Sequence, residues 1–199
     1  MQSVREIVRE LRRVVDAVLG VYLDATRGFH LVHEDIVGIQ KSMSEEMKGL
    51  PFGEISYLDK QPFIYGQGHP DEAQWPPLHV VTQEELKARN APGGQNYIFA
   101  GNMSLVTIYQ YWEKRFRPQL AAALGKSTDD LEVDVMGDVR RYRNSILHDD
   151  AVADANVGKN KVLKWFQPGD RVVITTNHLS ELVWKLGSEL ADLTGLEKE

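Results

Sequence analysis

The sequence predicts an all-α fold: a helical bundle of four main helices, with a long irregular insertion and a short extended segment in its C-terminal part. Apolar residues recur at steps of three and four in several long stretches, as on the buried face of an amphipathic helix. Proline and glycine concentrate between residues 50 and 95, too often for long regular elements. A length of 199 residues with 42% hydrophobic residues suits a sizeable core, so residues 1–199 are expected to form a single domain.

The N-terminal quarter of the chain is expected to hold two helices. The first covers residues 2–27, and its apolar positions are Val4, Ile7, Val8, Leu11, Val15, Val18, Leu19 and Tyr22. Gly28 is expected to bend or break the chain, because glycine is a poor helix former. A second helix follows from Phe29 to Met47 and ends at Gly49-Leu50-Pro51.

Residues 50–95 are expected to form an ordered but irregular insertion between two helical pairs. Its aromatic residues can cover apolar surface: Phe52, Tyr57, Phe63, Tyr65 and Trp75. Thr82-Gln83-Glu84-Glu85 has the spacing of a capping box and predicts one short helix that ends near Arg89.

The second half of the chain returns to helical periodicity. A third main helix covers residues 102–117, and Pro118 is expected to end or kink it. Ser127 or Thr128 is expected to cap the next helix, which runs to His148. The remaining elements are a short helix over 156–166, a brief extended segment from Arg171 to Thr175, and a last helix from Leu179 to about Leu193 that Thr176 or Asn177 caps.

The composition excludes several classes of protein. A net charge of −6 argues against a protein that coats nucleic acid non-specifically, so any contact with phosphates needs a local basic patch. The absence of cysteine excludes disulfides and thiolate metal sites and suits a reducing cytoplasm. No apolar stretch approaches the length of a membrane span, and the N-terminus is too charged for a secretory signal. We therefore expect a cytoplasmic protein without membrane contact.

The segment from Met136 to His148 predicts one helix with two unlike faces. Val135, Val139, Tyr142 and Ile146 form an apolar stripe suited to a core. Arg140, Asn144 and His148 recur at steps of four on another face, with Arg143 beside them. Two cations, an amide and an imidazole thus gather on one surface near a helix end, with no acid close by until Asp149 and Asp150. That imbalance points to a functional site.

Arg143-Asn144-Ser145-Ile146-Leu147-His148 resembles the Arg-x(4–6)-His signature of HEPN domains, in which a polar residue commonly follows the arginine. The match sits late in an expected helix, and the resemblance covers roughly residues 96–192. It implies a HEPN-like helical bundle and a metal-independent endoribonuclease. It also implies a homodimer in which paired arginine and histidine residues from two subunits line a composite cleft. The superfamily includes prokaryotic toxins and phage-defence effectors, so an antitoxin or another protein is a further candidate partner.

These residue types suit RNA cleavage through the substrate's own 2′-hydroxyl. An imidazole with an ordinary pKa near 6.5 can exchange a proton with the 2′-hydroxyl or the leaving 5′-oxygen, which gives His148 a catalytic role. Arg143 can hold the phosphate and stabilise charge on its oxygens. Asn144 is expected to support catalysis by orienting the imidazole or donating to the phosphate. Arg140 and Arg141 are interpreted as substrate-binding residues that contact RNA.

Other interpretations of the same residues stay open. Arg143 and His148 can instead cap the helix C-terminus, with Asp149 as an ion-pair partner. A non-catalytic HEPN module that binds nucleic acid, a nucleotide or a protein partner is the alternative function, and a plain helical interaction domain is the third. Exposed basic residues occur on solvated helix faces as well as on RNA-binding surfaces. Both interpretations apply to the arginines of the motif and to Lys159, Lys161, Lys164 and Arg171.

We expect no metal site and no cofactor. His30 and His33 have a spacing that can share a metal ion on a helix, but no third or fourth ligand is evident. His33 is therefore interpreted as a partly buried histidine of the core. Gly93-Gly94 predicts a turn, because no Lys-Ser/Thr pair follows it as in a phosphate-binding loop.

Overall fold

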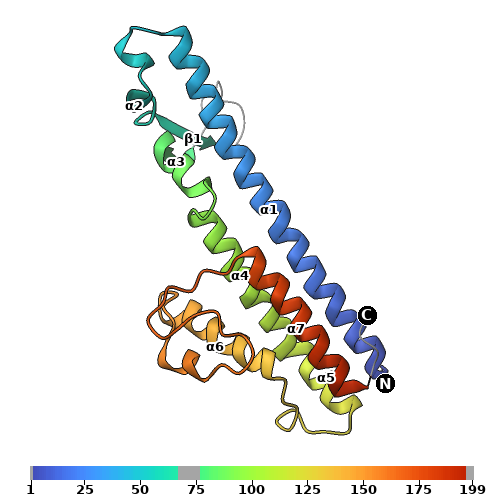
Figure 1. Ribbon diagram of the computed structural model, residues 1–199. Helices are drawn as coiled ribbons and strands as arrows, with labels where there is room; N and C mark the ends of the chain where they lie inside the picture. The colour runs from blue at the N-terminus through green and yellow to red at the C-terminus, as the bar shows by residue number, and fades with distance from the viewer. Residues whose placement is uncertain (1, 67–76, 196–199) are drawn as a thin grey trace. The chain divides into compact units, whose positions relative to one another are not determined.

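The computed structural model describes residues 2–66 and 77–195, and these are mostly helical with one two-stranded sheet (Figure 1). The elements in chain order are α1 (Val4–Glu46), the 3-10 turn η1 (Pro51–Gly53), α2 (Ile55–Leu58), β1 (Pro62–Gly66), β2 (Pro77–Thr82), α3 (Gln83–Asn90), α4 (Gln95–Tyr111), the π-helical segment η2 (Trp112–Phe116), α5 (Arg117–Ala123), α6 (Asp134–His148), the 3-10 turn η3 (Ala155–Lys159) and α7 (Thr176–Thr194). The prediction of a mainly helical fold is confirmed. The two-stranded sheet was not predicted.

The chain divides into two compact units. The first unit comprises Met1–Asp24 and Ile98–Glu199, and the second comprises Ala25–Tyr97. The second unit therefore contains the predicted insertion together with the C-terminal half of α1. Each unit is described by itself below.

The first unit is held by one apolar core. Buried residues of α1, α4, η2, α5, α6 and α7 form a single cluster, which includes Leu11, Leu105, Phe116, Val139 and Leu182. Burying side chains of this kind supplies the main driving force for folding, about 25 cal/mol for each Å² of apolar surface removed from water. α6 packs against α7 within this unit (Figure 1).

α1 continues through Gly28, so the expected break there is wrong. Glycine costs about 1 kcal/mol relative to alanine inside a helix, which packing on either side can outweigh. Tyr22 lies in the core of the first unit, and Phe29 packs edge-on against Tyr97 in the second. The helix begins with a capping box in which Ser3 and Glu6 exchange hydrogen bonds.

Pro118 was expected to end or kink its helix, and the helix does not end there. The wider π-helical turn of η2 precedes the proline, so that Pro118 falls in the first turn of α5. A proline is tolerated in the first helical turn, where its missing N–H is least needed. The chain therefore remains helical from Gln95 to Ala123.

The second unit contains an antiparallel hairpin where the sequence analysis expected only irregular chain and one short helix. Pro62 pairs with Thr82 and Tyr65 pairs with His79, because the β-formers of both segments favour extended backbone. The predicted short helix is confirmed as α3, with Thr82 and Glu85 forming the capping box. Trp75, one of the aromatic residues of the expected insertion, lies outside the described residues.

A buried polar group anchors the second unit. The Gln40 side chain on α1 donates to Asp59 Oδ1 at 2.9 Å and accepts from Lys87 Nζ at 2.8 Å. Lys87 also pairs with Asp59, and hydrogen bonding to its ammonium lowers the pKa of Asp59. These bonds join α1, α3 and the turn after α2 around Leu58 and Leu86, which are both buried.

The last helix, α7, begins at Thr176, three residues before the expected Leu179, and carries a half-buried histidine in its first turn. Thr175 is its N-cap, and the Thr175 N–H donates to His178 Nδ1 at 3.2 Å. The His178 ring packs against Trp165, with ring centroids 4.8 Å apart, and against Phe166 at 5.2 Å. Burial lowers the pKa of His178 from its ordinary value of 6.5, against an opposing hydrogen bond with the Val173 backbone.

This histidine predicts a pH dependence of stability. Because the folded pKa lies below 6.5, the unfolded chain binds a proton more readily, so His178 contributes stability that is present above pH 6.5 and lost as the pH falls through the folded pKa. His178→Gln keeps an acceptor at the third helical position but cannot titrate. We expect the free energy of unfolding in urea to fall more for the wild type than for His178→Gln between about pH 7.5 and about pH 5.5. Equal losses in the two proteins would contradict this assignment.

Candidate functional site

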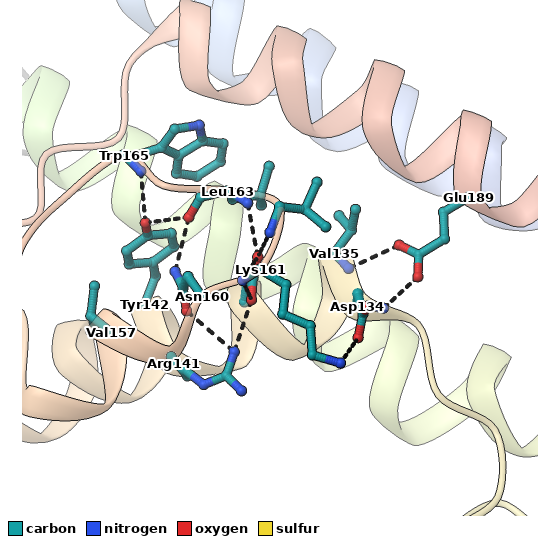
Figure 2. A network of polar contacts seen from close by, with 12 residues as sticks. Asp134, Val135, Arg141, Tyr142, Val157, Asn160, Lys161, Leu163, Trp165 and Glu189 are labelled. Atoms are coloured by element: carbon teal, nitrogen blue, oxygen red, sulfur yellow. Dashed lines mark hydrogen bonds and ion pairs between the residues drawn. The ribbon is translucent and has the colours of Figure 1, made fainter.

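α6 carries the predicted motif, and its N-terminus is fixed by a side chain from α7. The Glu189 carboxylate accepts hydrogen bonds from the backbone N–H groups of Asp134 and Val135, the second at 2.9 Å (Figure 2). An anion at this position satisfies free N–H groups and interacts favourably with the helix dipole. The expected caps are wrong, because Ser127 closes a separate turn by accepting from the Asp130 N–H.

A buried carboxylate fixes the inner face of α6. Asp138 is fully buried, and its oxygens accept from the backbone N–H groups of Lys161, Val162 and Leu163 at 2.7–3.1 Å. Arg141 Nη1 completes the arrangement at 2.8 Å from Asp138 Oδ1. A buried charge is tolerated when it is paired and hydrogen-bonded in this way. Asp138 therefore ties the segment after η3 to the helix.

The hydrogen bonds to Asp138 also explain why the helix predicted over 156–166 is short. Only Ala155–Lys159 forms a 3-10 turn, and residues 160–166 are irregular. The N–H groups that would continue a helix donate to Asp138 instead of to preceding carbonyls. The expected extended segment near Arg171 is present only as a single bridge with Val152.

Two further polar side chains of α6 hold this segment. The Tyr142 hydroxyl donates to the Leu163 carbonyl at 2.7 Å and accepts from the Trp165 N–H at 2.9 Å (Figure 2). The Tyr142 and Trp165 rings stack with centroids 5.3 Å apart, and burial raises the pKa of Tyr142. Ser145, also fully buried, accepts from the Asp154 N–H at 3.2 Å. The predicted core position of Tyr142 is confirmed.

The structure brings Arg143, Asn144 and His148 together at the C-terminal end of α6. Arg143 Nη1 donates to Asn144 Oδ1 at 2.9 Å and lies 3.5 Å from His148 Nε2. A guanidinium can only donate, so in a hydrogen bond between these two groups His148 Nε2 would be the acceptor. His148 is exposed, while Arg143 and Asn144 are half-buried.

The carboxylates that follow His148 do not pair with it. Among residues 2–66 and 77–195, neither Arg143 nor His148 forms an ion pair, and Asp149 and Asp150 are both exposed. The interpretation in which Asp149 neutralises these cations therefore finds no contact to support it. Asp150 and Ala151 have φ angles of 50° and 59°, in the left-handed region that non-glycine residues rarely adopt. Strain of this kind is often found at functional sites.

The other two arginines of the motif helix have separate surroundings. Arg140 is exposed and forms no hydrogen bond or ion pair with any described residue. Arg141 is held by Asp138 and also lies 3.3 Å from Asn160 Oδ1, so its contacts are structural (Figure 2). Nothing in its surroundings supports the interpretation of Arg141 as a substrate contact.

Two of the four basic residues that were considered as part of an RNA-binding rim bind neighbouring side chains. Lys161 pairs with Asp134 at 2.7 Å, and Lys159 donates to Asn156 at 2.9 Å. Lys164 and Arg171 are exposed.

Asp138 is a structural residue that was not predicted from the sequence. Asp138 lies four positions before Tyr142 and seven before Ser145, which places it on an inward face of the helix. An acid at a core position signals a buried carboxylate with partners, because such residues are almost never fully buried unless paired. Apart from Arg141, its partners are backbone groups more than twenty residues away, and no side-chain pattern marks them.

Hollows occur elsewhere among the described residues, but no metal site does. No group of three or more histidine, cysteine, aspartate or glutamate residues among them could hold a metal ion. His33 is half-buried and its Nδ1 lies 3.1 Å from the Lys87 carbonyl. A hollow of about 730 Å³ lies between α1 and α7, and a polar hollow of about 260 Å³ reaches Arg140. No described helix is long and apolar enough to cross a membrane.

Comparison with known proteins does not add to this picture. No family model, no curated protein and no solved structure matches the chain. The resemblance to HEPN domains therefore remains an expectation that depends on the residues from Arg143 to His148.

The Asp138 network predicts a large loss of stability on truncation. Asp138→Ala leaves three backbone N–H groups and the Arg141 guanidinium without their acceptor, and we expect it to lower the free energy of unfolding by about 3–5 kcal/mol in urea denaturation. Asp16→Ala, which removes an exposed aspartate of α1, is the control and should change stability by less than about 0.5 kcal/mol. A similar small effect for both variants would show that the network does not hold α6.

Proposed function

We propose that this chain is a metal-independent endoribonuclease of HEPN type, with His148 and Arg143 as catalytic residues and Asn144 in support. The observation that carries the proposal is the contact among these three side chains at an exposed helix end. Arg143 lies within 3.5 Å of both Asn144 and His148, and neither Arg143 nor His148 forms an ion pair with a carboxylate among the described residues. The resemblance further suggests the setting of a toxin or phage-defence effector in the cytoplasm.

The arrangement supports a transesterification. The 2′-oxygen of the substrate attacks the adjacent phosphorus, the bond from phosphorus to the 5′-oxygen breaks, and a 2′,3′-cyclic phosphate and a 5′-hydroxyl form. The His148 Nε2 lone pair can accept the 2′-hydroxyl proton. Arg143 has further N–H donors beyond the one given to Asn144, and these can stabilise charge on the phosphate oxygens.

One imidazole supplies only half of the proton transfer. The leaving 5′-oxygen needs a proton from an acid, and His148 of the partner subunit in a homodimer would provide it. This is the composite cleft that the resemblance implies. It requires the C-terminal end of α6 to be accessible, and the exposure of His148 is in keeping with that requirement.

Cleavage of labelled, structured RNA in the presence of EDTA tests the proposal. We expect the wild type to produce 2′,3′-cyclic phosphate ends, because no step needs a metal ion. Loss of a proton-transfer group costs about 10²–10⁴-fold in rate, so His148→Ala should be slower by that factor. Arg143→Ala should cost about 10²–10³-fold, as expected for a donor to a developing negative charge.

Matched controls separate these effects from general loss of charge. His30→Ala and Arg13→Ala each remove an exposed side chain of the same type from α1, and both should cleave at the wild-type rate. Absence of cleavage by a correctly folded wild type across several RNAs would contradict the enzyme. It would favour the alternative, a non-catalytic HEPN module that binds nucleic acid, a nucleotide or a protein partner.

A further inference from the structure

A polar hollow opens beside the N-terminal half of α6, in the first unit. It has a volume of about 260 Å³ and is lined by α4, η2 and the start of α5, by the segment that precedes α6, by α6 itself, and by Lys161 after η3. An apolar cavity of about 150 Å³ in another protein accepts benzene, so this hollow has room for one bicyclic heterocycle. Most of its exposed lining is polar, which distinguishes it from the apolar hollow between α1 and α7.

Most of the charges that line the hollow neutralise one another. Arg117 pairs with Glu113 at 3.3 Å and Lys161 with Asp134 at 2.7 Å, while Arg141 is held by Asp138. Three charged side chains remain. Arg140, Asp129 and Glu132 line the hollow and are exposed, and none forms a hydrogen bond or ion pair with a described residue. The hollow therefore presents one guanidinium and two carboxylates that are not engaged in a hydrogen bond or an ion pair within the described parts of the chain.

Two of the lining residues, Gly137 and Tyr109, suit a flat ligand. Gly137 lines it from the interior of α6, and a Cβ at this position would meet no other atom within 4 Å. Packing thus does not require glycine there, although glycine costs about 1 kcal/mol relative to alanine inside a helix. The half-buried ring of Tyr109 lines the same hollow, and aromatic rings are the usual stacking partners of unpaired bases.

We propose that this hollow binds a guanine base of the RNA substrate. Guanine is the one RNA base with two adjacent N–H donors, at N1 and the exocyclic amine, and a carboxylate such as Glu132 or Asp129 can accept both. Its other edge offers the O6 and N7 acceptors, which match the paired donors of an arginine such as Arg140. Adenine, cytosine and uracil lack this combination of edges.

The position of the hollow connects it with the proposed catalytic group. Arg140, Asn144 and His148 follow one another at steps of four residues, so Arg140 lies about 6 Å from Asn144 and about 12 Å from His148 along the helix axis. A base held at Arg140 would belong to a nucleotide close to the phosphate at Arg143 and His148. The inference rests on the proposed ribonuclease function and gives it a substrate preference.

Binding of the four nucleoside 5′-monophosphates to the full chain, followed by NMR at millimolar concentrations, tests this assignment without any cleavage. We expect GMP to bind about tenfold more tightly than AMP, CMP or UMP, because only guanine can form hydrogen bonds with the hollow along both of its edges. Arg140→Ala and Glu132→Gln should each remove most of that preference. Lys41→Ala, which removes an exposed lysine of the second unit, should leave it unchanged.

Gly137→Ala distinguishes an effect on GMP binding from an effect on the stability of the fold. A methyl group there should raise the melting temperature, because alanine is the better helix former, while it narrows the hollow and weakens GMP binding. Equal affinity for the four nucleotides, no detectable GMP binding, or a preference that survives both Arg140→Ala and Glu132→Gln would overturn the inference. GMP binding without RNA cleavage would contradict only the proposed enzyme, and cleavage without GMP binding would contradict only the guanine site.

Discussion

The Asp138 carboxylate is the interaction on which the geometry of the candidate site depends. It accepts three consecutive backbone N–H groups, from Lys161, Val162 and Leu163, and pairs with Arg141. A fully buried charge is stable only with such a set of partners, and its loss would leave all of them unsatisfied. These bonds hold the inner face of α6 in the core, and the opposite face of the helix lies at the surface. Arg143 and His148 can therefore sit at a fixed helix end without taking part in the core.

The two faces of α6 explain why residues of one type have different roles. Arg141 forms an ion pair with Asp138 and stabilises the fold, whereas Arg140, one position earlier, lines a polar hollow and forms no hydrogen bond or ion pair with a described residue. Arg143 contacts Asn144 and His148. A helix turns by about 100° for each residue, so neighbouring arginines face different surroundings. The proposed catalytic and base-binding roles follow from these surroundings and not from arginine content alone.

Much of the helical fold could be predicted from apolar periodicity, because the spacing of residues such as Val139 and Tyr142 is a local property. The grouping of Arg143, Asn144 and His148 was also predictable from helical spacing. The departures arise from contacts distant in sequence. Packing on both sides carries α1 through Gly28, and a π-helical turn accommodates Pro118. The start of α6 depends on Glu189, fifty-five residues away, which no local capping signal announces. The hairpin formed by β1 and β2 depends on pairing between two segments in which apolar and polar residues do not alternate regularly, so neither segment has a clear strand pattern.

The most direct test of the central claim is an NMR titration of the wild type with a 2′-O-methyl RNA, which can bind but cannot be cleaved through the 2′-oxygen. The account predicts that resonances of the His148 imidazole, the Arg143 guanidinium and the α6 amides near them shift together. These shifts should weaken as salt is raised, because phosphate contacts release bound counterions. Shifts confined to other parts of the chain, or none at all, would contradict the claim that this end of α6 is where the protein binds RNA.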